Sequence, residues 1–261
     1  MQLPIEWLPA TGRPEQLILL LHGWRSDGRA MAPLAQALRN AFPQAAVLAP
    51  DSPLAFERSA AELKKRDDIG RDLGRMWYGI DDLTAKNWPE RVAACLPPLV
   101  AWVRAQQQRL GVGPASTALV GFSQGAVLSL AAVQQEDGLA GRVLAFSGCY
   151  ATPPSTAPQH TTVHLFHGGG DTVIPADGSR QALRWLAQLQ GDATLDIAEE
   201  VGHELHPVLI DCALHRLTSH VPLRTWRAAL GAVPVVVAND EPGARAALSP
   251  GSSAASGTTR H

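Results

Sequence analysis

Residues 117–125 read Thr117-Ala118-Leu119-Val120-Gly121-Phe122-Ser123-Gln124-Gly125, an apolar run that ends in a Gly-x-Ser-x-Gly pentapeptide. The run predicts a strand over 117–120, and the residues that follow, 124–134, predict a helix. Between a strand and a helix, this pentapeptide is typical of a strained turn that lifts the serine hydroxyl above the edge of a sheet. A glycine-bounded turn in which Ser123 only caps the helix is the alternative interpretation.

Similar strand and helix patterns alternate on both sides of this segment. We expect strands at 17–21, 46–49, 143–146, 163–166 and 194–198, and helices at 31–42, 89–110, 178–190 and 205–217, with a kink at Pro97-Pro98 in the second helix. Such alternation predicts an α/β fold with a mostly parallel central sheet and helices on both faces. Ligands then bind beyond the carboxyl ends of the strands.

Composition limits the classes of partner. The 261 residues contain 22 basic and 24 acidic side chains, a net charge of −2 with no positive excess for nucleic acid. No apolar stretch reaches the roughly 18 to 20 residues of a membrane span, and the start lacks a secretory signal, which predicts a cytoplasmic protein. Three widely spaced cysteines indicate neither disulfides nor a thiolate metal site. A monomer and a homodimer are both compatible with this composition.

The expected domain organisation is simple. Residues 1–238 are predicted to form one catalytic domain, and 239–261, which contain almost no large apolar residue, a disordered tail. Residues 233–237 read as an extra strand or a linker. The charged stretch 56–75 reads as a solvated helix or loop, with a mobile cover over the site as the alternative.

A serine nucleophile needs a histidine base and a carboxylate that orients it. Asp171 lies in a glycine-rich loop after the strand expected at 163–166, and His203 lies in a loop after the strand expected at 194–198. The order Ser, Asp, His along the chain is that of α/β-hydrolases. Asp177 is the rival acid, and Cys149 is the alternative nucleophile.

Acyl transfer also needs donors for the negatively charged oxygen of the tetrahedral intermediate. The backbone amide of Gln124, directly after the nucleophile, is one candidate, and the amide of Trp24, in the loop after the first central strand, is the other. We expect His22 to shape that loop and not to react. A zinc site is not predicted, because a His-Glu-x-x-His pattern starting at His203 would need histidine where Pro207 stands.

Several of these motifs together resemble the phospholipase/carboxylesterase family of α/β-hydrolases, which includes acyl-protein thioesterases and small bacterial esterases. The matching segments are 21–23, 76–78, 121–125, 146–148, 167–168, 171–175 and 202–203. The resemblance implies Ser123 as nucleophile, Asp171 as acid and His203 as base, with the amides of Trp24 and Gln124 as the oxyanion hole. It also implies hydrolysis of a small-molecule ester or thioester without a cofactor.

We therefore expect a serine carboxylesterase. An acyl thioesterase or lysophospholipase with the same residues is the alternative, and a catalytically silent hydrolase-fold binding protein is the rival from another class. Trp77 and Tyr78 are candidates for the substrate pocket, with Leu54 and Phe56 as outside candidates, although ordinary core packing would equally explain these aromatic residues. The family usually has a small or aliphatic residue after His-Gly, whereas this chain has Trp24, so the acyl pocket is expected to differ.

Overall fold

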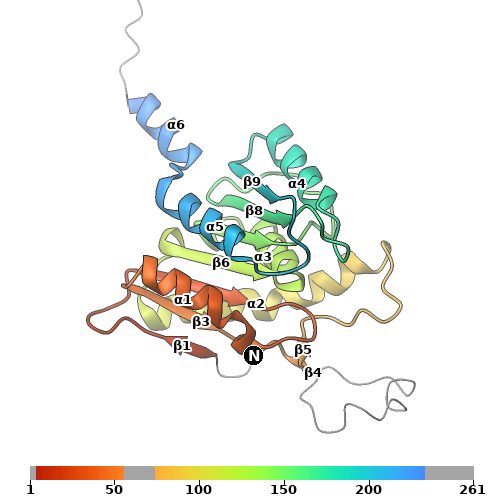
Figure 1. Ribbon diagram of the computed structural model, residues 1–261. Coiled ribbons are helices and arrows are strands. Elements are labelled where there is room, and N and C mark those ends of the chain that lie inside the picture. The colour runs from red at the N-terminus through yellow and green to blue at the C-terminus, as the bar shows by residue number, and fades with distance from the viewer. Residues whose placement is uncertain (1–3, 56–73, 233–261) are drawn as a thin grey trace, which may run out of the picture.

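The computed structural model describes residues 4–55 and 74–232 (Figure 1). The predictions made for Phe56, for most of the stretch 56–75, for 233–237 and for the tail 239–261 therefore lie outside the described residues. Within the described residues, none of the helices has the length and apolar character needed to cross a bilayer.

A seven-stranded sheet forms the centre of the described part of the chain, in the order β1-β3-β2-β6-β7-β8-β9. These strands are β1 (Ile5–Trp7), β2 (Gln16–Leu21), β3 (Ala45–Ala49), β6 (Thr117–Phe122), β7 (Arg142–Phe146), β8 (Thr162–Gly168) and β9 (Ala193–Ala198). Only the edge strand β1 is antiparallel to its neighbour. The carboxyl ends of the other six strands therefore share one edge, where the loops that follow them can meet.

Helices cover both faces of the sheet. They are α1 (Ala32–Ala41), α2 (Trp88–Leu110), α3 (Gln124–Gln135), α4 (Asp177–Gln188), α5 (Pro207–Ser219) and α6 (Leu223–Ala232). Buried residues of α2, α3 and α4 belong to one hydrophobic cluster, and those of α1 and α5 to a second cluster on the other face. Figure 1 accordingly shows α1 and α5 in front of the sheet and α2 and α3 behind it. The predicted α/β fold, with a mostly parallel central sheet and helices on both faces, is confirmed.

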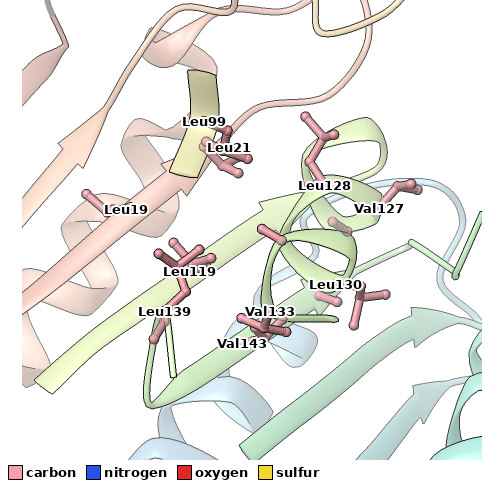
Figure 2. Packing of buried hydrophobic residues seen from close by; sticks show 14 of the residues in the cluster. Leu19, Leu21, Leu99, Leu119, Val127, Leu128, Leu130, Val133, Leu139 and Val143 are labelled. Atoms are coloured by element: carbon pink, nitrogen blue, oxygen red, sulfur yellow. The ribbon is translucent and has the colours of Figure 1, made fainter. Parts of the chain in front are cut away.

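Strand β2 shows why the central strands are apolar throughout. Leu17, Leu19 and Leu21 point into the cluster with α2 and α3, whereas Ile18 and Leu20 point into the cluster with α1. Because both faces are covered, neither side of the strand can be polar. Figure 2 shows the first cluster, with leucines of β2 and β6 packed between the sheet and the side chains of α2 and α3.

The expected elements are all present with boundaries shifted by a few residues. Helix α2 runs through Pro97-Pro98 as one element, and short 3₁₀ turns at Gly28–Met31 and Pro114–Ser116 precede α1 and β6. Three features were not predicted, namely β1, helix α6 and a two-stranded sheet of β4 (Leu54–Ala55) and β5 (Arg75–Met76).

Candidate active site

The Gly-x-Ser-x-Gly segment forms a sharp turn between β6 and α3. Ser123 has φ +54° and ψ −116°, a conformation that side chains rarely adopt. A Cβ atom on Gly125 would lie 2.0 Å from the carbonyl oxygen of Leu21, and one on Gly121 would lie 2.2 Å from the backbone of Gly125. Both glycines are therefore required by close backbone packing. Ser123 makes no side-chain capping bond to α3, so the capping interpretation does not describe its side chain.

Ser123, His203 and Asp171 form one hydrogen-bonded chain at the carboxyl edge of the sheet. His203 Nε2 lies 3.1 Å from Ser123 Oγ, and His203 Nδ1 lies 2.7 Å from Asp171 Oδ2. The three residues follow β6, β8 and β9, whose parallel arrangement brings loops 80 and 32 residues apart into contact. The ring of Phe122 lies 4.9 Å from that of His203, centre to centre, and restricts the imidazole on one side.

Asp171 is held as a carboxylate by several donors. Its Oδ1 accepts hydrogen bonds from the backbone N–H groups of Val173 and Ile174, both at 2.9 Å. Burial of the carboxyl opposes ionisation, but the hydrogen bonds from His203 and these two amides outweigh it and keep the pKa of Asp171 below its ordinary value. The rival Asp177 begins α4 with an exposed side chain that pairs with Arg180, 3.4 Å away.

A second histidine fixes the loop that carries this carboxylate. His167 Nε2 lies 2.8 Å from the carbonyl oxygen of Ile174 and 3.3 Å from Asp171 Oδ2, and its Nδ1 lies 2.7 Å from Ser179 Oγ. Because a carbonyl oxygen only accepts, Nε2 must carry a proton. Burial lowers the pKa of His167, although Ile174 and Asp171 oppose that shift. These contacts give His167 a structural role next to Asp171.

Two aspartates with a lowered pKa, Asp171 and Asp192, are expected to make the stability of the fold depend on pH in the acid range. Asp192, directly before β9, also has a lowered pKa, because hydrogen bonds from Thr162, Leu223 N and His220 outweigh its burial. Unfolded aspartates titrate at about pH 3.9, so the stabilisation is complete above that value and is lost as the pH falls towards the lower folded pKa. We expect Asp192→Asn to lose less Tm than wild type between pH 6 and pH 3.5 in thermal melts. A loss equal to that of wild type and of the exposed-site control Asp177→Asn would contradict this.

The loop after β2 passes close to Ser123. A Cβ atom on Gly23 would lie 3.0 Å from Phe122 Cδ1 and 3.3 Å from Ser123 Cβ. Gln124 is the first residue of α3, where backbone N–H groups have no partner within the helix and the helix dipole favours negative charge. The two segments predicted to carry the oxyanion donors, those of Trp24 and Gln124, thus both lie next to Ser123.

His22 orients the peptide that carries the Trp24 amide. The backbone N–H of Ser52 donates to His22 Nε2 at 3.0 Å, so Nε2 is unprotonated and Nδ1 carries the proton. That Nδ1–H donates to the carbonyl oxygen of Gly23 at 2.7 Å. In a trans peptide, N–H points opposite to C=O, so fixing the Gly23 carbonyl also fixes the direction of the Trp24 N–H. Burial lowers the pKa of His22 and keeps this neutral form.

The side chain of Gln124 binds the segment after β5, and this segment in turn contacts the loop 22–24. Gln124 Oε1 accepts from the backbone N–H of Trp77 at 3.0 Å, and Nε2 donates to the carbonyl oxygen of Tyr78 at 2.9 Å. The indole Nε1 of Trp77 in turn donates to the carbonyl oxygen of His22 at 2.8 Å. One buried network therefore connects Gln124, the segment 77–78 and the loop 22–24.

We expect His22→Ala to lower kcat by about a hundredfold to a thousandfold, the usual loss for one oxyanion donor, with KM nearly unchanged. The reason is that the Gly23–Trp24 peptide would no longer be held in one orientation. Steady-state kinetics on a soluble ester give both constants, and thermal melts report stability separately. A variant with lower Tm but kcat within threefold of wild type would show that His22 only supports the fold.

A cavity of about 680 Å³ opens beside Ser123 and His203. Its other lining residues are Trp24, Tyr78, Ile80, Leu83, Trp88, Phe122, Gln124, Cys149, Val173, Ile174 and Pro175. Of the pocket candidates from the sequence, Tyr78 lines this cavity, whereas Trp77, which is buried, and Leu54 line a separate cavity. Cys149 shares the cavity with Ser123, but burial raises the pKa of its thiol to about 11, which disfavours the thiolate.

Most of the residues that line this cavity were not predicted from the sequence. Ile80, Leu83 and Trp88 come from an irregular segment and the start of α2, and Val173 and Ile174 follow Asp171. Aromatic and aliphatic residues in such segments give no periodic signal, so only their position after strand ends could have indicated them. In the described ranges, no group of three or more His, Cys, Asp or Glu residues is placed to hold a metal ion.

The chain is similar to known proteins in sequence and in fold. Residues 8–221 match the family model described as Phospholipase/Carboxylesterase. Esterase YpfH of Escherichia coli is 37% identical over 216 residues, covering 83% of this chain and 88% of that protein. A rice protein named probable inactive carboxylesterase Os04g0669700 is 27% identical over 214 residues, covering 78% and 84%.

Solved structures agree with the sequence matches. The crystal structure of esterase PE8 superposes with a TM-score of 0.72 at 29% identity, covering 84% of this chain and 98% of that one. The family model spans both strand-end loops that carry Asp171 and His203, as well as the turn at Ser123. With that match and the identity to the bacterial esterase over most of both chains, the protein belongs to the phospholipase/carboxylesterase family of α/β-hydrolases.

Proposed function

We propose that this protein is a serine carboxylesterase in which Ser123 is the nucleophile, His203 the general base and Asp171 the acid that orients it. The observation that carries the proposal is the hydrogen-bonded chain from Ser123 through His203 to Asp171 beside an apolar cavity. Membership of a family of carboxylic ester hydrolases, and the name of the E. coli relative, support the same reaction class.

The proposed reaction has two acyl-transfer steps. Ser123 Oγ attacks the ester carbonyl carbon while His203 Nε2 takes the hydroxyl proton, and the carbonyl oxygen becomes an anion next to the amides of Trp24 and Gln124. When the tetrahedral intermediate collapses, the alcohol leaves with the proton from His203 and the acyl group stays on Ser123. Water then attacks the acyl-enzyme while His203 again takes the proton, and collapse of this second intermediate releases the carboxylic acid as His203 returns the proton to Ser123 Oγ. Asp171 stabilises the transient imidazolium throughout.

The composition of the cavity wall favours a neutral, apolar substrate. Its described lining residues include no lysine, arginine or carboxylate, and its volume lies within the usual range for small-molecule sites. A charged group beside the ester would lose hydration there without gaining a partner. Tyr78 is part of the wall and Trp77 positions it through the network with Gln124, so we assign the two aromatic residues different roles.

A series of p-nitrophenyl esters tests the proposal. We expect turnover of acetyl to octanoyl esters, a higher kcat/KM for the longer chains that fill the cavity, and covalent labelling of Ser123 by a fluorophosphonate. Mass spectrometry of the labelled peptide identifies the residue. No turnover together with no label on the native protein would leave a hydrolase fold used for binding, in line with a relative named as inactive.

Ile80→Trp tests whether the cavity holds the substrate chain. Ile80 lines the cavity and is 38% exposed, so the larger ring can enter the space without disturbing the core. We expect kcat/KM for the octanoyl ester to fall at least about tenfold relative to the acetyl ester, the effect of a few misplaced methylenes. Leu230→Trp, at an exposed apolar position on α6, is the matched control. An unchanged chain-length profile in Ile80→Trp would place the substrate elsewhere.

A further inference from the structure

A second cavity lies at the opposite edge of the sheet from Ser123. It has a volume of about 350 Å³ and is lined at the amino ends of three strands by Gln16 of β2, Thr117 of β6 and Arg142 of β7. Arg224, at the start of α6, closes it from the other side. None of its lining residues takes part in the site described above, so it needs a separate explanation.

The two arginines lack a carboxylate partner. In the part of the chain that the structure describes, neither guanidinium is within ion-pair distance of an aspartate or glutamate. Both donate instead to the same two neutral oxygens, Thr162 Oγ1 and the carbonyl oxygen of Gly141, at 3.2 to 3.4 Å. Since each guanidinium has five N–H donors, two shared oxygens leave most of them without a protein acceptor.

The nearest carboxylate cannot neutralise the pair by direct contact. Asp192 Oδ2 accepts from the Thr162 hydroxyl at 2.6 Å and from the N–H of Leu223 at 3.0 Å, and its Oδ1 lies 3.0 Å from His220 Nε2. The Thr162 hydroxyl thus lies between Asp192 and the arginines. Burial and the charge of Arg224 both lower the pKa of Arg142, while Asp192 opposes that shift. Two half-buried positive charges against one negative charge leave a local excess of positive charge.

We infer that Arg142 and Arg224 bind an organic carboxylate in this cavity. A planar guanidinium fork matches a carboxylate with two parallel charge-assisted hydrogen bonds, which would supply the missing negative charge. The remaining wall is largely apolar and includes the partly exposed side chains of Phe42, Leu217 and Pro222. A carboxylate with a short aliphatic chain satisfies both parts of the cavity, whereas an inorganic anion would leave the apolar wall in water.

Calorimetric titration of the full chain with sodium octanoate tests this site. We expect saturable binding, at least tenfold weaker binding of inorganic phosphate, which has the charge but no tail, and at least tenfold weaker binding of 1-octanol, which has the tail but no charge. Arg224→Gln should weaken octanoate binding about tenfold to a hundredfold through the loss of charged hydrogen bonds. Arg227→Gln, an exposed arginine on the same helix that does not line the cavity, is the matched control and should bind as wild type does.

Arg142→Gln provides a second test on the sheet side, in case a change at Arg224 loosens α6, and it should weaken octanoate binding to a similar extent. Equal octanoate affinity in wild type and both variants would overturn the inference and place any bound octanoate in the cavity beside Ser123. Phosphate binding as tight as octanoate would overturn the assigned ligand class. Esterase turnover is a separate readout, so failure of this site leaves the proposed function untouched.

Discussion

Replacing Ser123 with alanine is expected to lower kcat by about 10⁵- to 10⁶-fold, close to the loss of all three members of a serine triad in a serine hydrolase. No other hydroxyl among the described residues is hydrogen-bonded to His203, so nothing can take over the attack. The residual rate would come from the oxyanion donors and substrate binding alone. Single-turnover and steady-state assays on one p-nitrophenyl ester measure the loss.

Two control variants make the serine result specific. Cys149→Ala removes the thiol in the same cavity and should keep kcat within about tenfold of wild type, because a buried thiol with raised pKa is a poor nucleophile. Ser155→Ala changes an exposed serine in the loop before β8 and should behave as wild type. Retained turnover in Ser123→Ala combined with its loss in Cys149→Ala would transfer the nucleophile to the cysteine.

The sheet was predictable from the sequence because both of its faces are buried. Strand β2 reads as an uninterrupted apolar run, and the Gly-x-Ser-x-Gly turn has a close backbone approach at each glycine. Ser123, Asp171 and His203 each follow a strand expected from the sequence. The structure brings their side chains within hydrogen-bonding distance. These features were visible because each follows from a local pattern.

The elements that were missed have weak local patterns. Strand β1 has three residues, β4 and β5 have two each, and the apolar side chains Trp226 and Leu230 of α6 are more than half exposed. Short or exposed segments bury little surface, so no periodicity marks them.

The roles of His22, Trp77 and Arg142 depend on partners far apart in the chain. The indole of Trp77 reaches the carbonyl oxygen of His22, 55 residues away, and Arg142 shares its two hydrogen-bond acceptors with Arg224, which lies on α6. No spacing rule applied to the sequence could assign these contacts. Side-chain hydrogen bonds between distant segments therefore had to come from the structure.

Asp171→Asn is expected to lower kcat by about 10⁴-fold while leaving the fold intact. In the native site the carboxylate accepts the proton of His203 Nδ1, which leaves Nε2 free to accept the proton of Ser123. The asparagine can present an N–H to Nδ1 instead, because its oxygen is the group best placed to accept from Val173 N and Ile174 N, as Asp171 Oδ1 does now. His203 would then carry its proton on Nε2, where it faces Ser123 and cannot act as base.

Asp177→Asn is the matched control for this change, since it makes the same substitution on an exposed aspartate six residues away and removes only the pair with Arg180. We expect this variant to keep wild-type kcat, and both variants to keep wild-type circular dichroism. Assigning Asp171 or Asp177 as the orienting carboxylate predicts opposite results for these two variants, so one assay decides between the two assignments. If Asp177→Asn lost activity and Asp171→Asn did not, the orienting carboxylate would be Asp177. If neither lost more than about tenfold, His203 would not depend on a carboxylate for its tautomer, and the proposed mechanism would lose its acid.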